Sequence, residues 1–331
     1  LMADINAFKS EKLLPNFKWH PQCHFPARYI FIKKKFPEMS FKDQTCEDFT
    51  WWKNRINAKS ISVIFSSYYP GNAASFFGHT FLKLNSKVDN QDSITDFALD
   101  FAAATDNHNF FIYAVKGLLG GYPGFFSTPT YYEKINQYAH LDSRDLWEYR
   151  INLTQAEVDW FVTHVWELKM NTYYDYYFLT ENCSYMLLEA LDVVRMDQNV
   201  SRSYYWYAMP IDTIRRIDQE LGIAETNYRP SAKSKLVGQE NILNPEQFKI
   251  YLAYWDDKES YSVINDREVL ETIIANYRHK MFVEQDPEKK EKINLKLRVI
   301  LIHRAKLGAV SYTHLSCRRI ERCRCRWSPY H

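Results

Sequence analysis

Two residues in this sequence have the types and settings that nucleophilic chemistry requires. Cys183 follows Asn182 at the start of an apolar, helix-periodic stretch, and His79 lies earlier, in a run that is typical of a strand. The positive end of a helix dipole favours a thiolate at the helix start. A histidine beside that thiolate would accept and return a proton. The sequence therefore predicts a Cys–His pair if the fold brings the two together; otherwise both are structural core residues.

A third polar group usually orients the imidazole of such a pair. The stretch 94–101 alternates as a strand does, with Asp96 and Asp100 on one face. Asp100 is the predicted partner of His79, with Asp96 in reserve. The alternative is that both carboxylates lie on a solvated strand face.

Backbone N–H groups around Cys183 are expected to hold the oxyanion of an acyl-transfer intermediate. An asparagine at a helix start is by default a cap. The residues expected to shape the oxyanion site are Glu181, Asn182 and Ser184.

No metal or cofactor is predicted. His108, His140 and His164 have no partners at ligand spacing, and neither HExxH nor Cys-x-x-Cys occurs before residue 309. The glycine-rich run 117–124 matches no nucleotide-binding pattern and is expected to be a loop, either a flap beside the site or a plain turn.

The elements that must position these residues indicate an α+β fold. Prolines break the segment 1–58, which is expected to be irregular. A capping box at Thr154 and Glu157 predicts a helix to about residue 170, and the Cys183 helix follows from about 182. From about 216 the pattern is helical, with prolines at the first helical positions 245 and 287. Strands are expected at 60–66, 76–84, 94–101 and 146–153, with an extended run at 173–178.

The last part of the chain differs from the rest. Residues 311–331 carry five Arg and one Glu, which leaves 37 of the 42 basic and 39 of the 40 acidic residues elsewhere, a net charge of −2. This charge balance lacks the excess of basic residues that is typical of nucleic-acid-binding proteins. The string VSYTHL (310–315) resembles a translated sequencing adapter, so 309–331 is interpreted as a sequencing or assembly artefact. Taken at face value, it would be a metal knuckle or a basic arm.

Three cysteines precede that tail: Cys23, Cys46 and Cys183. An odd number favours one pair and one free thiol, which would leave Cys183 as the reactive one. A Cys23–Cys46 disulfide would require an oxidising compartment. The sequence has no apolar stretch long enough to span a membrane. It begins without a signal peptide and is interpreted as a fragment that has lost one.

Three long motifs resemble the Lnb-type N-terminal periplasmic domain, a family long catalogued as a domain of unknown function in Gram-negative bacteria. They are NAASFFGHTFL (72–82), KGLLGGYPG (116–124) and DYYFLTENCSY (175–185), and RDLWEY (144–149) fits as well. CHFPAR (23–28) followed by Cys46 resembles an N-terminal extension of some members. The resemblance covers roughly 59–215.

The order of histidine before cysteine is similar to that of circularly permuted papain-like enzymes, the NlpC and lecithin–retinol acyltransferase superfamily. This resemblance implies an antiparallel sheet with a helix that carries Cys183 as nucleophile, and His79 as base. The family's namesake is implicated in N-acylation of bacterial lipoproteins, which implies acyl transfer from a phospholipid through a thioester at the membrane surface. It also implies a C-terminal membrane-associated region, which we expect to be missing from the sequence up to residue 308.

The expected organisation is an extension over 1–58, a catalytic domain over 59–215, a helical region over 216–308 and the suspect tail. The expected function is that of a periplasmic or cell-envelope thiol acyltransferase or acyl hydrolase acting on phospholipid or lipoprotein. One alternative is a cysteine amidase or peptidase on peptidoglycan peptides. Another is a non-catalytic envelope module, in which Cys183 and His79 lie too far apart to interact.

Overall fold

The chain forms two compact units, the first ending at Ser231 and the second beginning at Ala232. The computed structural model describes residues 1–10, 13, 18–68, 78–87, 93–104, 110–195, 197, 200–203 and 208–308. The suspect tail 309–331 and the 72–77 part of the first motif lie outside these residues. Within those ranges, every helix is too short or too polar to span a lipid bilayer.

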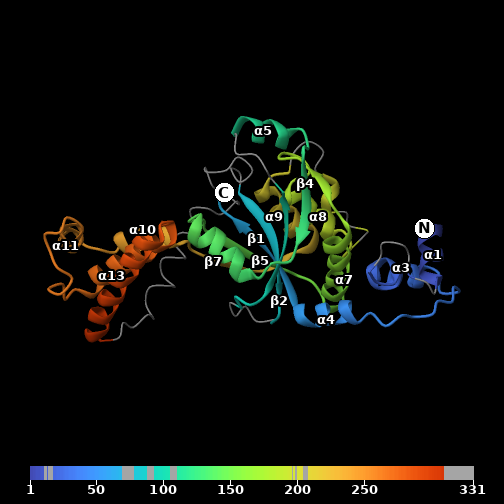
Figure 1. Ribbon diagram of the computed structural model, residues 1–331, viewed down its shortest axis with the longest axis horizontal. Helices are drawn as coiled ribbons and strands as arrows, with labels where there is room; N and C mark the ends of the chain where they lie inside the picture. The colour runs from blue at the N-terminus through green and yellow to red at the C-terminus, as the bar shows by residue number, and fades with distance from the viewer. Residues whose placement is uncertain are drawn as a thin grey trace. The chain divides into compact units, whose positions relative to one another are not determined.

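An antiparallel sheet forms the centre of the first unit (Figure 1). In the described part of the chain it has seven strands in the order β6-β4-β3-β2-β1-β5-β7. With the helices, it makes the fold α+β, as the sequence predicts. The strands are β1 (Ser60–Ser66), β2 (His79–Asn85), β3 (Phe97–Ala103), β4 (Tyr122–Ser127), β5 (Leu146–Ile151), β6 (Tyr174–Tyr176) and β7 (Ile223–Arg229).

Both faces of the sheet are covered, because successive side chains of a strand point to opposite sides. On one face, residues such as Val63 and Leu82 join the main core with side chains from four helices. On the other face, Ile64 and Phe81 pack against a smaller helical segment that includes Tyr138. The four helices are α4 (Glu47–Ile56), α7 (Gln155–Asn171), α8 (Cys183–Leu191) and α9 (Pro210–Leu221), and the smaller segment is α6 (Tyr131–Ile135) with the π-helix η2 (Asn136–Leu141).

Segment 1–58 is more helical than its prolines predict. Pro21 and Pro26 occupy first-turn positions, where a missing N–H costs nothing, so they begin helices instead of breaking them. The helices are α1 (Met2–Lys9), α2 (Pro21–His24) and α3 (Pro26–Lys35), before α4.

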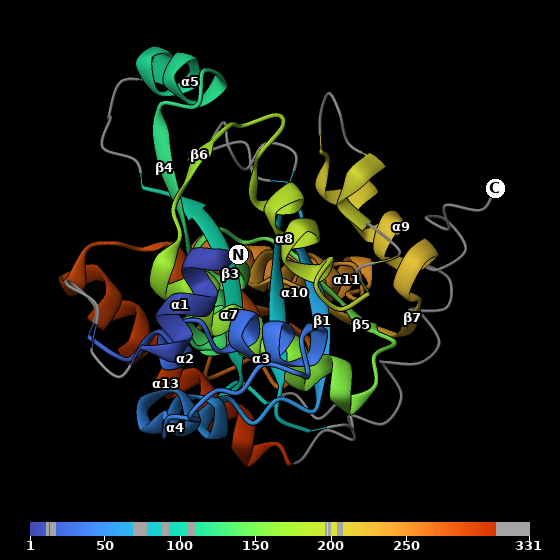
Figure 2. The same ribbon diagram turned by 90° about the vertical axis from the view of Figure 1, so that its right-hand side faces the viewer.

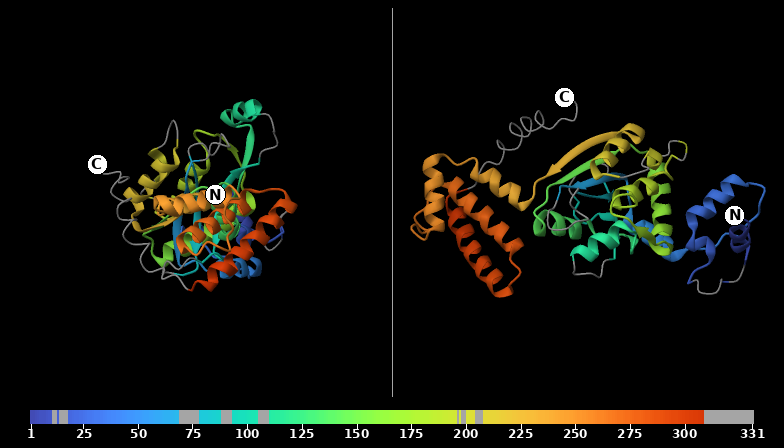
Figure 3. Two further views of the ribbon diagram at one scale, coloured as in Figure 1. Left: turned by 90° about the vertical axis from the view of Figure 1, so that its left-hand side faces the viewer. Right: turned by 90° about the horizontal axis from the view of Figure 1, so that it is seen from above.

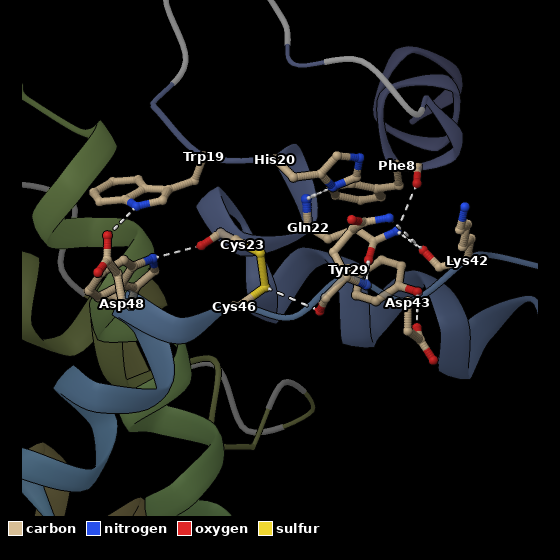
Figure 4. The surroundings of a disulfide bond; sticks show 12 residues. Phe8, Trp19, His20, Gln22, Cys23, Tyr29, Lys42, Asp43, Cys46 and Asp48 are labelled. Atoms are coloured by element: carbon tan, nitrogen blue, oxygen red, sulfur yellow. Dashed lines mark hydrogen bonds between the residues drawn. A yellow bond between two sulfur atoms is a disulfide. The ribbon is translucent and has the colours of Figure 1, made fainter.

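The predicted Cys23–Cys46 disulfide is confirmed (Figure 4). The indole N–H of Trp166, on α7, donates to the carbonyl oxygen of Cys23 at 2.9 Å. The backbone N–H of Arg28, on α3, donates to the Glu167 carboxylate at 2.8 Å. The helix α4, which follows Cys46, also contacts α7, so the disulfide joins two stretches that both dock on α7.

Removal of this disulfide with the double substitution Cys23→Ser and Cys46→Ser is expected to destabilise segment 1–58. The bridge closes a loop with a sequence separation of 23, and such a loop contributes about 3 kcal/mol. Amide hydrogen exchange should become faster in α2 and α3, whereas exchange in the strands of the sheet should stay slow. Unchanged exchange in α3 would contradict the role given to the bridge.

The glycine-rich run 117–124 is not the loop that the sequence predicts. Gly117 lies in the helix α5 (Phe110–Leu118) and Gly124 in β4, so only 119–121 connect the two elements. A Cβ on Gly117 would lie 2.2 Å from the Phe178 ring, and Gly120 has φ +73°. Gly117 therefore allows close packing inside a helix, and Gly120 allows one tight turn. Glycine content alone does not separate these two roles from a glycine-rich loop.

The helical pattern expected from about residue 216 is interrupted by β7, which pairs with β5. Gly222, at φ +79°, ends α9 and lets the chain reverse into the strand. The predicted border at 215/216 thus falls inside the first unit, within α9. The short 3₁₀ helix η3 (Val200–Ser203) precedes α9.

The second unit is helical in its described part, and its helices pack side by side (Figure 3). Val269, Leu270 and Ile273 lie at the centre of its core. The proline starts predicted at Pro245 and Pro287 are confirmed. The helices are α10 (Ala232–Glu240), α11 (Pro245–Trp255), α12 (Arg267–Val283) and α13 (Pro287–Lys306).

Candidate active site

Cys183 is the first residue of α8 and is buried. Asn182 caps the helix: its side-chain oxygen accepts from the N–H groups of Ser184 at 3.0 Å and Tyr185 at 3.2 Å. Its amide nitrogen donates to the carbonyl oxygens of Phe178 and Ala208. Both ends of this amide are therefore used to fix the helix start, and the thiol lies where the helix dipole favours negative charge.

His79 is the first residue of β2, and it reaches both of its expected partners. Its Nε2 donates to the Asp100 carboxylate at 2.8 Å, and its imidazole also makes a hydrogen bond with the Cys183 side chain. Because Nε2 is engaged with the carboxylate, Nδ1 is the nitrogen left for the thiol. The fold thus brings together three residues that are far apart in the sequence.

Asp100 lies on β3, beside β2, and is buried. Its second oxygen accepts from the Lys134 ammonium group of α6 at 2.5 Å. Burial raises the pKa of this carboxyl, but His79 and Lys134 outweigh that effect and hold the pKa well below its usual range. The carboxylate therefore stays charged and keeps its acceptor oxygen directed at the imidazole.

The thiol and the imidazole stabilise each other's charged forms. Burial raises the pKa of the Cys183 thiol. The positive charge of His79, the hydrogen bond between His79 and the thiol, and the backbone N–H of Thr80 together lower that pKa to about 7. Burial lowers the pKa of His79, but the negative charge of Cys183 and the hydrogen bond to Asp100 raise it to about 9. Between these two values the pair exists as thiolate and imidazolium, the state of an activated nucleophile.

Tyr176, on the edge strand β6, adds a hydroxyl that sequence reasoning missed. The backbone N–H of Cys183 donates to the Tyr176 hydroxyl oxygen at 3.2 Å. Burial and the negative charge of Cys183 raise the pKa of Tyr176 well above its usual value, so the hydroxyl keeps its proton. The ring stacks on Phe101 at a centroid distance of 5.5 Å, which fixes this donor beside the thiol.

The other predicted site-shaping residues have different surroundings. The Ser184 hydroxyl is buried and bonds the Thr80 hydroxyl at 2.9 Å, so it ties α8 to β2. Glu181 is exposed and lines a cavity of about 630 Å³ together with Tyr173 and Tyr177. The Ser184 hydroxyl also lies 4.0 Å from the Cys183 sulfur, within reach of a weak hydrogen bond to the thiol.

Asp96, the reserve for Asp100, belongs to another buried network. Its carboxylate accepts from the Ser86 hydroxyl at 2.6 Å and lies 3.9 Å from the Lys83 ammonium group. Lys83 in turn bonds Glu148 at 3.1 Å. The structure therefore brings Asp100, and not Asp96, to His79.

Lys134 and Tyr138 are two further residues of the site that the sequence does not predict. They come from α6 and η2, and the Tyr138 ring lies 5.5 Å from the His79 ring. Nothing in the local sequence marks these residues, because only the packing of this helical segment on the sheet brings them to the histidine. In the described ranges, no group of three His, Cys, Asp or Glu residues is arranged to hold a metal ion.

The profile of the Lnb N-terminal periplasmic domain family matches residues 48–220, just over half of the chain. The chain belongs to this family, as its motifs predict. The matched range contains Cys183, His79 and Asp100 and starts inside α4. No curated protein and no solved structure matches the chain.

Proposed function

We propose that the chain is a cell-envelope thiol acyltransferase or acyl hydrolase that takes its acyl group from a phospholipid. The observation that carries the proposal is the buried Cys183–His79 pair, with Asp100 on the far side of the imidazole. A thiol without such partners would stay protonated at neutral pH. A periplasmic site of action follows from the family and agrees with the Cys23–Cys46 disulfide.

In the first half-reaction, the Cys183 thiolate attacks the ester carbonyl carbon of the lipid. As the C–O bond breaks, the His79 imidazolium gives its proton to the leaving lysophospholipid oxygen, and a thioester remains on Cys183. The Tyr176 hydroxyl accepts from the N–H of Cys183, keeps its own proton and is suited to donate it to the oxyanion.

In the second half-reaction, an amine or a water molecule attacks the thioester. His79 accepts the proton of the attacking group, and the C–S bond breaks to restore the thiolate. A lipoprotein amine gives acyl transfer and water gives hydrolysis. Asp100 stabilises the imidazolium at both stages.

The arrangement also supports a permuted papain-like fold, in which the histidine strand precedes the cysteine helix. β2 carries His79 and pairs with β3, which carries Asp100, and α8 packs against both strands.

The test is intact-mass analysis of the chain after incubation with phosphatidylethanolamine in detergent micelles. We expect one acyl chain on Cys183, removable by neutral hydroxylamine, and none on the Cys183→Ala variant. Cleavage of peptidoglycan peptides without an acyl adduct would replace the lipid with a peptide substrate. If neither reaction occurs, both enzymatic assignments fail and the non-catalytic alternative holds.

A further inference from the structure

Helix α5 carries large apolar side chains on the surface of the first unit. Figures 1 and 2 show it projecting beyond the end of β4, away from the body of the sheet. Leu119, directly after the helix, is 73% exposed. Ile112, Val115 and Leu119 are exposed and follow each other at helical spacings of three and four, which places them on one face.

The side of α5 that faces the protein is apolar as well. The Tyr113 ring packs against Phe178 at 5.0 Å and Tyr122 at 5.7 Å. The one charged residue in the sequence of α5 is Lys116, whose ammonium group lies over the Tyr122 ring at 4.6 Å. A helix that is apolar on both sides is typical of a protein core or of contact with lipid, and not of contact with water.

Exposed apolar side chains also lie on β4, which follows α5, and on the segment 173–179, which bonds to α5. Phe125 of β4 and Leu179 are exposed, and the Tyr173 ring, 72% exposed, lies 6.3 Å from the ring of Phe125. Tyrosines beside an apolar surface suit the boundary of a bilayer, where the ring is buried and the hydroxyl stays hydrated.

This surface is joined to the segment that carries the nucleophile. The N–H of Phe178 donates to the Gly117 carbonyl oxygen of α5 at 2.9 Å. Five residues after Phe178, the same segment reaches Cys183, with Asn182 as the cap of α8. The segment that contacts α5 is therefore the one that leads into the candidate active site.

We propose that α5, with Leu119, Phe125, Tyr173 and Leu179, docks in the interface of a phospholipid bilayer. The proposal deepens the proposed function, on which its choice of lipid rests. At nine residues, α5 is too short to span a bilayer but long enough to lie in its headgroup region. Docking would bring the segment that leads to Cys183 to the membrane surface.

The charges near α5 indicate what kind of bilayer it binds. Lys116 is the helix's one charge, and the exposed side chains Asp175 and Glu181 follow on the neighbouring segment. This balance does not attract anionic lipid. Binding is therefore driven by apolar burial, so it should persist at high salt and on vesicles without net charge.

The test is flotation of the full chain with vesicles of phosphatidylcholine and phosphatidylethanolamine, with Cys183→Ala as the parent so that no lipid is consumed. Leu119→Asp should weaken partitioning about tenfold or more, since it puts a charge in place of an exposed leucine that docking would bury in the bilayer. Ile112→Asp should act in the same way, and Leu119→Ile should bind like the parent. The matched control is Ile30→Asp, at an exposed isoleucine of α3, which should float unchanged.

Three results would overturn the docking proposal: a parent that does not float, a Leu119→Asp variant that floats equally well, and binding that requires anionic lipid and is lost in salt. The thermal unfolding midpoint of each variant shows whether it is folded. If Leu119→Asp instead converts a dimer to a monomer and leaves flotation intact, the surface is a self-interface and the proposal is wrong.

Failure of docking and failure of the proposed function give different results. With Cys183 intact, Leu119→Asp should still form the acyl adduct from lipid in detergent micelles, because its active site is unchanged. Flotation of the parent without any adduct in the intact chain would keep the docking surface and remove the acyl chemistry. An adduct in micelles without flotation of the parent would keep the acyl chemistry and remove the docking surface.

Discussion

His79→Ala is expected to remove the reactivity of Cys183 at neutral pH. Without the imidazolium, burial is the largest remaining influence on the thiol and raises its pKa from about 7 to above the ordinary value. The thiolate fraction at pH 7, and with it the rate of alkylation by iodoacetamide, should fall by about 50-fold. The measurement is the alkylation rate from acid to alkaline pH, with the modified cysteine identified by mass spectrometry.

The matched control for this prediction is His164→Ala. His164 is another histidine of the first unit, and burial lowers its pKa to about 4, so it brings no positive charge at neutral pH. Its replacement should leave the alkylation profile of Cys183 in place. An identical profile for wild type and His79→Ala would show that the imidazole does not activate the thiol.

Asp100→Asn is expected to reduce acyl transfer on the order of 10³-fold, with little change in the overall fold. An asparagine keeps the shape of Asp100 but loses its charge, so the imidazolium loses its partner and the ring can adopt the wrong tautomer. Lys134 loses the carboxylate that it contacts at 2.5 Å. The measurement is the rate of acyl-adduct formation from micellar phospholipid, together with the pH profile of alkylation.

Asp96→Asn separates this effect from the loss of any buried carboxylate. Asp96 is equally buried, but it bonds Ser86 and lies near Lys83. Its replacement should lower stability without moving the alkylation profile. An equal loss of rate in both variants would mean that the effect is structural, and Asp100 would lose its role as orienting residue.

The parts of the site that the sequence predicts are those with a local signal. Cys183 follows a capping residue and lies in phase with an apolar helical stripe, and Asp100 follows from strand alternation. Alternation alone does not separate Asp100 from Asp96, because both fit the same face. The choice depends on register, which pairs Leu82 with Leu99 and so sets Asp100 diagonally across from His79.

Other parts depend on tertiary contacts that no local pattern encodes. Lys134 reaches Asp100 only because α6 covers one face of the sheet, and Tyr176 reaches Cys183 from an edge strand of three residues. Glycine and proline content also gives wrong predictions of loops, because each of these residue types occurs in helices as well. Gly117 allows close packing inside a helix, and Pro26 begins a helix, although both types usually mark loops.

The central claim is that Cys183 and His79 form an ion pair at neutral pH. Titration of the ultraviolet absorbance of the thiolate tests it most directly, as the difference between the wild-type chain and Cys183→Ser at each pH. A thiolate that appears with a midpoint near pH 7 is the predicted result. A midpoint at or above about 8.5, the value of an ordinary thiol, would contradict the claim.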